Sequence, residues 1–216
     1  MKLAVFDCDG TLVDSQANIV LAMNDAFARA GLQAPDPHAT RRVVGLSLVE
    51  AMQAMLPDAE PDFQVSLAED YRQAFHRLRA EQRLSAEPLY PGVADGLAEL
   101  VSRGWRLGVA TGKSDRGLAL CLAHHGLADH FVTLQTADRH PSKPHPAMLH
   151  AAIREAGSTP GRAVMIGDTV FDMAMGAAAG ARAIGVDWGY HEPHELHAAG
   201  AERVVTSFGE LLAALE

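Results

Sequence analysis

The sequence predicts an α/β protein with a parallel, doubly wound sheet and a separate all-helical insert. Three observations carry this prediction: short apolar runs recur, each is followed by Gly, Asp or Thr, and helical patterns lie between them. Runs of four apolar residues without alternation are typical of strands buried on both faces. The runs are residues 3–6, 107–110, 163–166 and 183–186. Strands that alternate with helices form a parallel sheet covered by helices.

Helical spacing marks the segments between these runs. One helix is indicated by apolar residues at i, i+4, i+7 and i+8, namely Val93, Leu97, Leu100 and Val101. Residues 115–125 and 146–156 also have helical patterns. Pro146 suits a first helical position, because the N–H that proline lacks has no intrahelical partner there.

The stretch from residue 15 to residue 85 breaks the alternation, since it contains no run of strand type. Apolar side chains recur there at helical spacing around residues 19–27, 49–55 and 67–78. Gly31 is placed to end the first of these helices. We therefore predict an all-helical domain at residues 15–85, inserted into an α/β core of residues 1–14 and 86–216.

Composition narrows the classes of function. Hydrophobic residues make up 48% of the 216 residues, which is enough for a well-packed core. The formal charge is −9 and no Lys/Arg-rich run is present, so a nucleic-acid partner is not expected. No apolar run approaches the roughly 20 residues of a membrane span. With two cysteines and an N-terminus that turns acidic too early for a signal peptide, we expect a cytoplasmic protein, monomeric or homodimeric.

Two acidic pairs follow two of the predicted strands. Asp7 and Asp9 come directly after the first strand, and Gly10 allows a sharp turn there. Carboxylates this close repel, so one is expected to act as nucleophile and metal ligand and the other as general acid. Asp168 and Asp172 follow a later strand, and oxygen ligands of this kind suit Mg²⁺. A solvated turn for the first pair and helix capping for Asp172 are the alternatives.

Two further segments indicate a phosphate site. Thr111 and Gly112 follow the run at 107–110, where a hydroxyl and exposed backbone N–H groups at a helix start bind anions. Lys143 lies between Ser142 and Pro144 in a proline-rich loop, and a cation held in this way suits a phosphoryl group. Each of these two signals is weak by itself.

In this order the four segments resemble the haloacid dehalogenase-like hydrolase superfamily, and specifically its phosphatases, over essentially the whole chain. The most specific motif begins Asp7-Cys8-Asp9-Gly10-Thr11-Leu12-Val13-Asp14-Ser15. This motif and the C-terminal Trp188-Gly189-Tyr190-His191 are similar to the phosphoglycolate phosphatase subfamily. The resemblance implies a Rossmann-like core, a small helical cap that closes over the site, and a small phosphorylated metabolite as substrate.

The resemblance also implies roles for individual residues. Asp7 would be the nucleophile and Asp9 the general acid and base. Asp7, the Asp9 carbonyl, Asp168 and Asp172 would hold Mg²⁺. The phosphoryl group would be bound by Gly10, Thr11, Thr111, Gly112 and Lys143. Independently of the resemblance, Arg41 and Arg42 near Gly45 either contact a second anionic group of the substrate or lie on the solvated surface.

Other functions stay open at this stage. A phosphosugar mutase, a pyrophosphatase or a nucleotidase of the same superfamily would share these motifs. A non-catalytic phospho-acceptor module is the alternative from another class, and a dehalogenase is disfavoured by Asp9, Thr11 and Asp168. His191, His194 and His197 recur every three residues, but their polar surroundings favour a structural role over metal binding. Cys8 should point away from the site.

Overall fold

A central parallel sheet organises the molecule, which the computed structural model describes from residue 1 to residue 216. The strand order is β3-β2-β1-β4-β5-β6, and every pair is parallel. The strands are β1 (Leu3–Phe6), β2 (Arg106–Thr111), β3 (Phe131–Thr136), β4 (Ala163–Gly167), β5 (Arg182–Val186) and β6 (Arg203–Val205). The predicted α/β class with a parallel, doubly wound sheet is confirmed.

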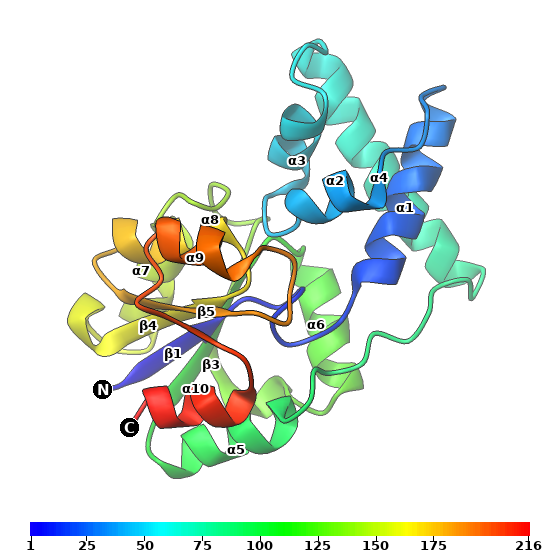
Figure 1. Cartoon of the computed structure of the whole chain (residues 1–216). Helices are drawn as coiled ribbons and strands as arrows, with labels where there is room; N and C mark the ends of the chain where they lie inside the picture. Colours follow the sequence, from blue (N-terminus) through cyan, green and yellow to red (C-terminus); the bar gives the residue numbers. More distant parts are fainter.

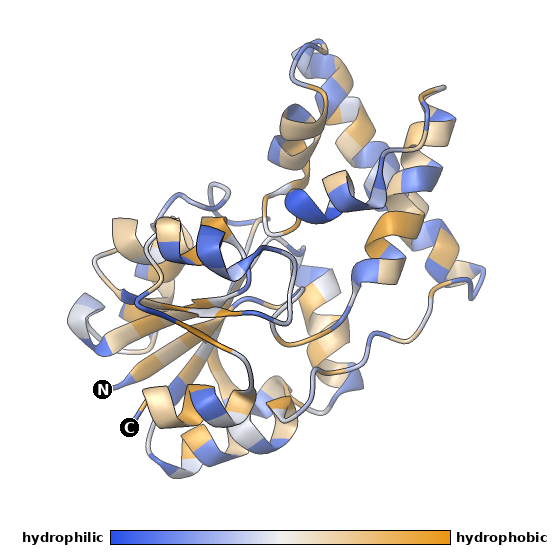
Figure 2. Ribbon diagram, in the orientation of Figure 1, coloured by the Kyte–Doolittle hydropathy of each residue, from blue (hydrophilic) through white to orange (hydrophobic).

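Helices cover both faces of this sheet (Figure 1). The core helices are α5 (Val93–Ser102), α6 (Asp115–His124), α7 (Ala147–Glu155), α8 (Val170–Ala178), α9 (Pro193–Ala198) and α10 (Phe208–Ala214). Side chains of α5, α6 and α10 pack with one face of the strands in the largest hydrophobic cluster, and those of α7 and α8 pack with the other face. Apolar residues accordingly dominate the central strands in Figure 2. Two 3-10 turns, Ala128–His130 and Pro160–Arg162, precede β3 and β4.

The chain reverses its direction of travel across the sheet at β1. From β1 it reaches β2 and then β3 on one side, and later β4, β5 and β6 on the other. In open parallel sheets such a reversal leaves a crevice beyond the carboxyl ends of the strands, where ligands bind. A ligand site is therefore expected among the residues that follow β1, β2 and β4.

Two strands and part of one helix face differ from the sequence prediction. β3 and β6 were not predicted, because both are edge strands without a continuous apolar run. Val101 is 46% exposed, whereas Val93, Leu97 and Leu100 of the same helix are fully buried. Pro146 is the N-cap residue of α7, one position earlier than predicted.

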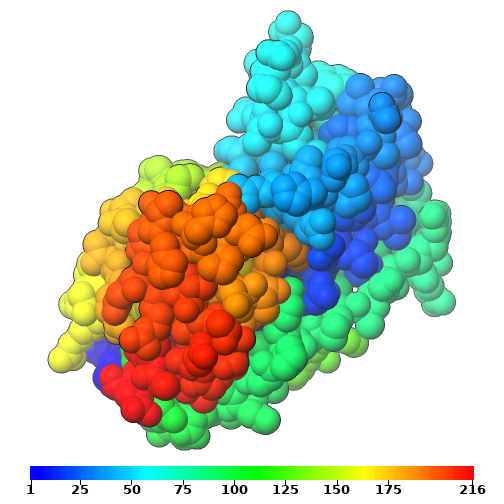
Figure 3. Space-filling view, in the orientation of Figure 1, coloured from blue at the N-terminus to red at the C-terminus, as the bar shows by residue number.

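Four helices lie between β1 and the remaining sheet elements, namely α1 (Gln16–Arg29), α2 (Pro37–Arg42), α3 (Leu48–Met55) and α4 (Pro61–Ala80). They form a separate helical body in Figures 1 and 3, and α1, α3 and α4 enclose a hydrophobic cluster of their own. Gly31 follows the end of α1 with φ 72°, as a helix stop requires. The limits of this cap segment at residues 15 and 85 stay a prediction.

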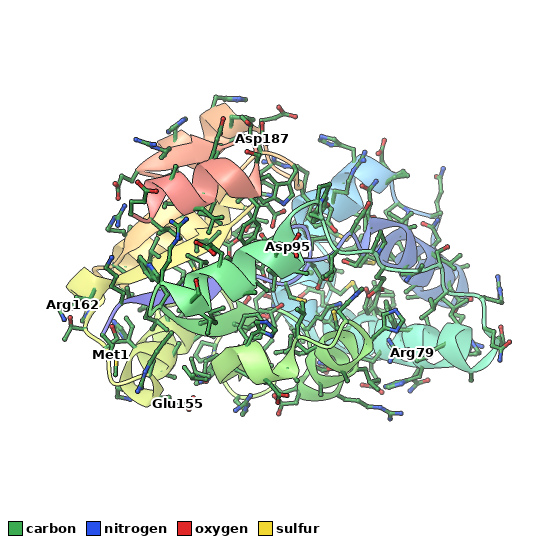
Figure 4. All side chains as sticks on the ribbon, turned by 90° about the horizontal axis from the view of Figure 1, so that it is seen from below. Met1, Arg79, Asp95, Glu155, Arg162 and Asp187 are labelled. Carbon is green, nitrogen blue, oxygen red and sulfur yellow. The ribbon has the colours of Figure 1, made fainter.

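The cap segment and the amino-terminal edge of the sheet lie at opposite sides of the molecule. Figure 4 places Arg79, at the end of α4, far from Met1 and Arg162. The cap segment thus stands over the carboxyl ends of the strands (Figure 1). None of the helices combines the length and the apolar character that crossing a membrane requires.

Candidate active site

The strand ends bring together residues that lie far apart in the sequence. Phe6 of β1 pairs with Ile166 of β4, and the N–H of Asp7 donates to the Ile166 carbonyl at 2.9 Å. Asp7 and Asp168 therefore leave the sheet side by side. Thr111, the last residue of β2, is fully buried on the other side of β1. The two acidic pairs predicted from sequence meet at one crevice.

Three buried carboxylates form the centre of this site. Asp7, Asp168 and Asp172 are each 0% exposed, and one oxygen of each lies within 4.8 Å of the others. The ammonium of Lys143, whose side chain is also fully buried, lies 2.9 Å from Asp7 Oδ1 and 2.7 Å from Asp172 Oδ1. The structure therefore places Lys143, which was a weak signal in the sequence, between the nucleophile candidate and the second acidic pair.

The electrostatics of this cluster follow from its burial. Burial, together with Asp172 and Asp9, raises the pKa of Asp7 to about 7, although Lys143 acts in the opposite direction. Burial and the two neighbouring carboxylates also raise the pKa of Asp168 well above its usual value. For Lys143, burial opposes the charged form, but Asp172 and Asp7 outweigh it and raise the pKa of the ammonium. The cluster thus has more negative charge than one lysine compensates.

Asp168 is held in a fixed orientation from two sides. Thr11 Oγ1 donates to Asp168 Oδ1 at 2.7 Å, and the Tyr190 N–H donates to Oδ2 at 3.0 Å. Gly10 and Gly189 permit this close packing, because a Cβ at either position would lie 2.2 Å from an atom of the Asp168 side chain. Gly10 also has φ 82°, a conformation that favours glycine. The first motif and the segment around Tyr190 therefore position the same carboxylate.

Asp172 takes part in helix capping and in the acidic cluster at once. Its Oδ2 accepts hydrogen bonds from the Thr169 N–H and hydroxyl at 3.1 and 2.7 Å, which completes a capping box at the start of α8. Its Oδ1 faces the ammonium of Lys143. The capping alternative from the sequence is confirmed, and the same side chain lies in the charged centre.

Asp9 has partners that sequence reasoning did not assign. Lys113 Nζ lies 2.8 Å from Asp9 Oδ1, and the hydroxyl of Ser15 donates to the same oxygen. Burial opposes the charge on Lys113, but Asp9 raises the pKa of its ammonium above the usual value. Both residues lie in segments that the sequence analysis had already marked, the turn after β2 and the first acidic motif. Their position just beyond the carboxyl ends of β1 and β2 was the available sign that they belong to the site.

A cavity of 1320 Å³ opens above this crevice between the cap segment and the core. Asp9, Gly112 and Lys113 line it from the core, and the loop around Gly45 lines it from the cap segment. A Cβ at Gly112 would lie 2.5 Å from the Leu46 carbonyl oxygen, so the cap segment rests directly on the turn after β2. The Ser47 N–H also donates to Ser142 Oγ at 2.8 Å.

The arginines at the end of α2 lie elsewhere. Neither Arg41 nor Arg42 is among the residues that line the cavity. The guanidinium of Arg42 pairs with both carboxylate oxygens of Glu195 on α9, at 2.6 and 2.8 Å. This pair joins the cap segment to the core. A contact between either arginine and a substrate stays a prediction.

The histidine series and Cys8 have structural surroundings. His191 is buried and accepts a hydrogen bond at Nδ1 from the Val170 N–H, while its Nε2 faces the Arg42 carbonyl at 3.3 Å. The three histidines of the series form no group that could hold a metal ion, and His194 and His197 are exposed. Cys8 packs in the hydrophobic core with its Sγ 3.9 Å from that of Cys121. An orientation of this thiol away from the site stays a prediction.

The residues present fit a divalent cation. Asp7 Oδ2 is buried and has no hydrogen-bond partner in the protein. Four carboxylates, Asp7, Asp9, Asp168 and Asp172, face two ammonium groups, so the site has a formal excess of two negative charges. Hard carboxylate oxygens are the ligands that Mg²⁺ prefers. Asp7 and Asp168 with Asp172 thus offer a suitable donor set.

Comparison with known proteins agrees with this architecture. The model of the haloacid dehalogenase-like hydrolase family matches residues 4–186, and the chain belongs to that family. Among its relatives, the probable phosphatase IndB of Dickeya dadantii is 38% identical over 98% of this chain and 92% of that protein. A phosphoglycolate phosphatase of Chromobacterium violaceum is 36% identical over 98% of this chain and 95% of its own length.

Solved structures show the same fold over the whole chain. A predicted phosphatase from Clostridium acetobutylicum has a TM-score of 0.87 at 25% identity, with 99% of this chain and 97% of that chain covered. A hydrolase from Pseudomonas syringae has a TM-score of 0.86 at 26% identity and covers 100% and 98% of the two chains. The Rossmann-like core of a haloacid dehalogenase-like hydrolase is therefore established for this protein.

Proposed function

We propose that this chain is a Mg²⁺-dependent phosphatase that hydrolyses a small phosphomonoester through an aspartyl phosphate on Asp7. The observation that carries the proposal is the buried cluster of Asp7, Asp168 and Asp172 around Lys143 at the switch point of the sheet. Buried carboxylates with a raised pKa in a crevice mark a functional site. The relatives named as phosphatases support the reaction class.

In the first step, a carboxylate oxygen of Asp7 attacks phosphorus and the bond to the leaving oxygen breaks. Asp9 donates a proton to that oxygen, which leaves as an alcohol. Lys143, 2.9 Å from Asp7, balances negative charge on the phosphoryl oxygens. Thr111 and Gly112 contribute hydrogen bonds to the same group, whereas the Thr11 hydroxyl donates to Asp168.

In the second step, Asp9 removes a proton from water, and the resulting hydroxide attacks phosphorus of the aspartyl phosphate. Phosphate leaves, and the carboxylate of Asp7 is restored. Asp7, Asp168, Asp172 and the Asp9 carbonyl would hold Mg²⁺, which when bound neutralises charge on the phosphoryl oxygens. The raised pKa of Asp7 supports this assignment, because a nearby cation would keep that carboxylate ionised.

We further propose that residues 15–85 act as the cap that selects the substrate. The cap segment supplies one wall of the cavity and rests on Gly112 beside the phosphoryl site. One relative is named a probable phosphatase and another a phosphoglycolate phosphatase. From these names we infer that the substrate is a small phosphorylated metabolite. Cytoplasmic location belongs to the same proposal.

The experiment is a screen of phosphomonoesters, including 2-phosphoglycolate, with purified protein and Mg²⁺. The wild type should release phosphate over many turnovers and retain label on Asp7 after acid quenching. Asp7→Asn should show neither, because an amide is a poor nucleophile. Asp9→Asn should slow turnover by about 10²–10⁴-fold. Release of phosphate by Asp7→Asn at the wild-type rate would refute the mechanism, and a stable label without turnover would indicate a phospho-acceptor module.

A further inference from the structure

The two carboxylate oxygens of Asp9 differ in their contacts with the protein. Lys113 Nζ lies 2.8 Å from Oδ1, and Ser15 also donates to Oδ1. Both bonds thus end on one oxygen, which leaves Oδ2 free of protein hydrogen bonds. The side chains of Lys113 and Asp9 are only 13% and 10% exposed, so solvent competes weakly for this pair.

The backbone at Lys113 is fixed from both sides. Its N–H donates to Thr111 Oγ1 at 3.2 Å, and its carbonyl accepts from the Ala137 N–H at 3.4 Å. The preceding residue, Gly112, rests against the cap segment at Gly45 and Leu46. These contacts fix the backbone position from which the Lys113 side chain reaches Asp9.

The two lysines of the site contact different carboxylates. Lys143 contacts Asp7 and Asp172, whereas Lys113 contacts Asp9. Asp9 lines the open cavity and lies two residues from the buried Asp7, so repulsion between carboxylates favours its rotation toward solvent. The contact with Lys113 opposes that rotation.

We propose that Lys113 is a positioning residue for Asp9, and that it holds Oδ1 so that Oδ2 delivers the proton to the leaving oxygen. This inference rests on the proposed function, because it assigns a use to the general acid of that reaction. It gives a role to Lys113, a side chain to which neither the sequence analysis nor the proposed function assigns one.

Leaving-group dependence tests the proposal. Protonation is essential when the leaving group is an alkoxide, and it matters little for p-nitrophenolate, which is stable as an anion. The ratio kcat/KM reports the steps up to departure of the leaving group. Lys113→Met should therefore lower kcat/KM for an alkyl phosphomonoester by about 10²-fold, and for p-nitrophenyl phosphate by less than about threefold. Lys113→Arg should recover part of the loss.

Arg116→Met is the matched control, since Arg116 lies on α6 beside the same cavity and forms no ion pair with Asp9. It should leave the ratio between the two substrates unchanged. Equal losses for both substrates in Lys113→Met, or no loss for the alkyl ester, would overturn the proposal. If the methionine variant does not fold, Lys113→Gln carries the same comparison.

Crystal structures of wild type and variant give a test that needs no activity. We expect the Asp9 carboxylate to turn away from its wild-type orientation in Lys113→Met, and an unchanged orientation would count against the proposal. If the wild type hydrolyses neither ester, the proposed function fails, and this structural comparison still decides the placement of Asp9.

Discussion

Replacement of Lys143 by methionine removes the one cation that contacts Asp7 and Asp172. The methionine keeps most of the length and apolar contacts of the lysine stem, so the change is mainly electrostatic. In the wild type the ammonium lies 2.9 Å from Asp7 and 2.7 Å from Asp172, in a side chain that is 0% exposed. The variant would bury these carboxylates with no compensating ammonium.

The magnitude follows from the burial. Removing one partner of a buried ion pair costs about 3–5 kcal/mol of unfolding free energy. Each kcal/mol shifts Tm by about 2–4 °C in a chain of this size, so we expect a decrease of roughly 6–20 °C in the presence of a chelator. Mg²⁺ should raise the Tm of the variant more than that of the wild type, because the remaining negative charge is larger. Turnover should fall by about 10²–10³-fold, since Lys143 also balances charge on the phosphoryl group.

Thermal unfolding with and without Mg²⁺ measures both effects on the same samples. Lys2→Met is the control, because Lys2 is exposed and its ammonium lies over the Trp105 ring at 5.2 Å, outside the site. A Lys143→Met variant whose Tm stays within about 2 °C of the wild type in chelator would refute the reasoning. So would an equal response of both proteins to Mg²⁺.

Three further perturbations follow from the same structure. Gly10→Ala should reduce kcat by about 10²-fold, because a Cβ would lie 2.2 Å from Asp168 Oδ2 and a misplacement of this order disrupts catalysis. Gly31→Ala is the control, because Gly31 also has a positive φ, 72°, but a Cβ there would meet no atom within 4 Å; it should lower stability and leave kcat intact. A normal kcat in Gly10→Ala would count against the packing of Gly10 on Asp168. Chelation should abolish phosphate release, Mg²⁺ should restore it, and Ca²⁺ should restore it poorly, because its coordination shell is larger and more flexible; full activity after chelation contradicts the metal assignment. Burial lowers the pKa of His191 below its usual 6.5, so below that pH the unfolded chain binds more protons than the folded one. The unfolding free energy of the wild type should therefore decrease faster than that of His191→Gln as pH falls from about 6.5 to 5, with a difference in slope of at most about 1.4 kcal/mol per pH unit. Chemical denaturation at several pH values measures it, and parallel profiles would exclude His191 as the cause.

The central part of the fold was predictable from the sequence. The strands β1, β2, β4 and β5 are buried on both faces, and that burial requires unbroken apolar runs that are visible in the sequence. The edge strand β3 alternates in burial at its start, and β6 has only three residues, so neither carries this signal. The helix α2, with the sequence PHATRR, has no apolar periodicity and escaped prediction for the same reason.

The acidic motifs indicated the chemistry, because each acidic pair begins at the end of a predicted strand and the carboxyl ends of neighbouring parallel strands lie at the same side of the sheet. Asp7 and Asp168 could be placed together on that basis. Their partners could not be placed in this way. Lys113 and Asp9 meet across two strand ends, and Arg42 and Glu195 meet at a separation of 153 residues.

By itself, the sequence determined the elements whose side chains are buried along their whole length, together with the positions of the carboxylates at the strand ends. Local patterns are sufficient for both, because periodicity and strand-end position are properties of neighbouring residues. Only the tertiary structure decided which cation compensates which carboxylate, and which arginine joins the cap segment to the core. These pairings depend on distances between segments that local sequence does not encode, and with long side chains a shift of a few ångströms exchanges one partner for another.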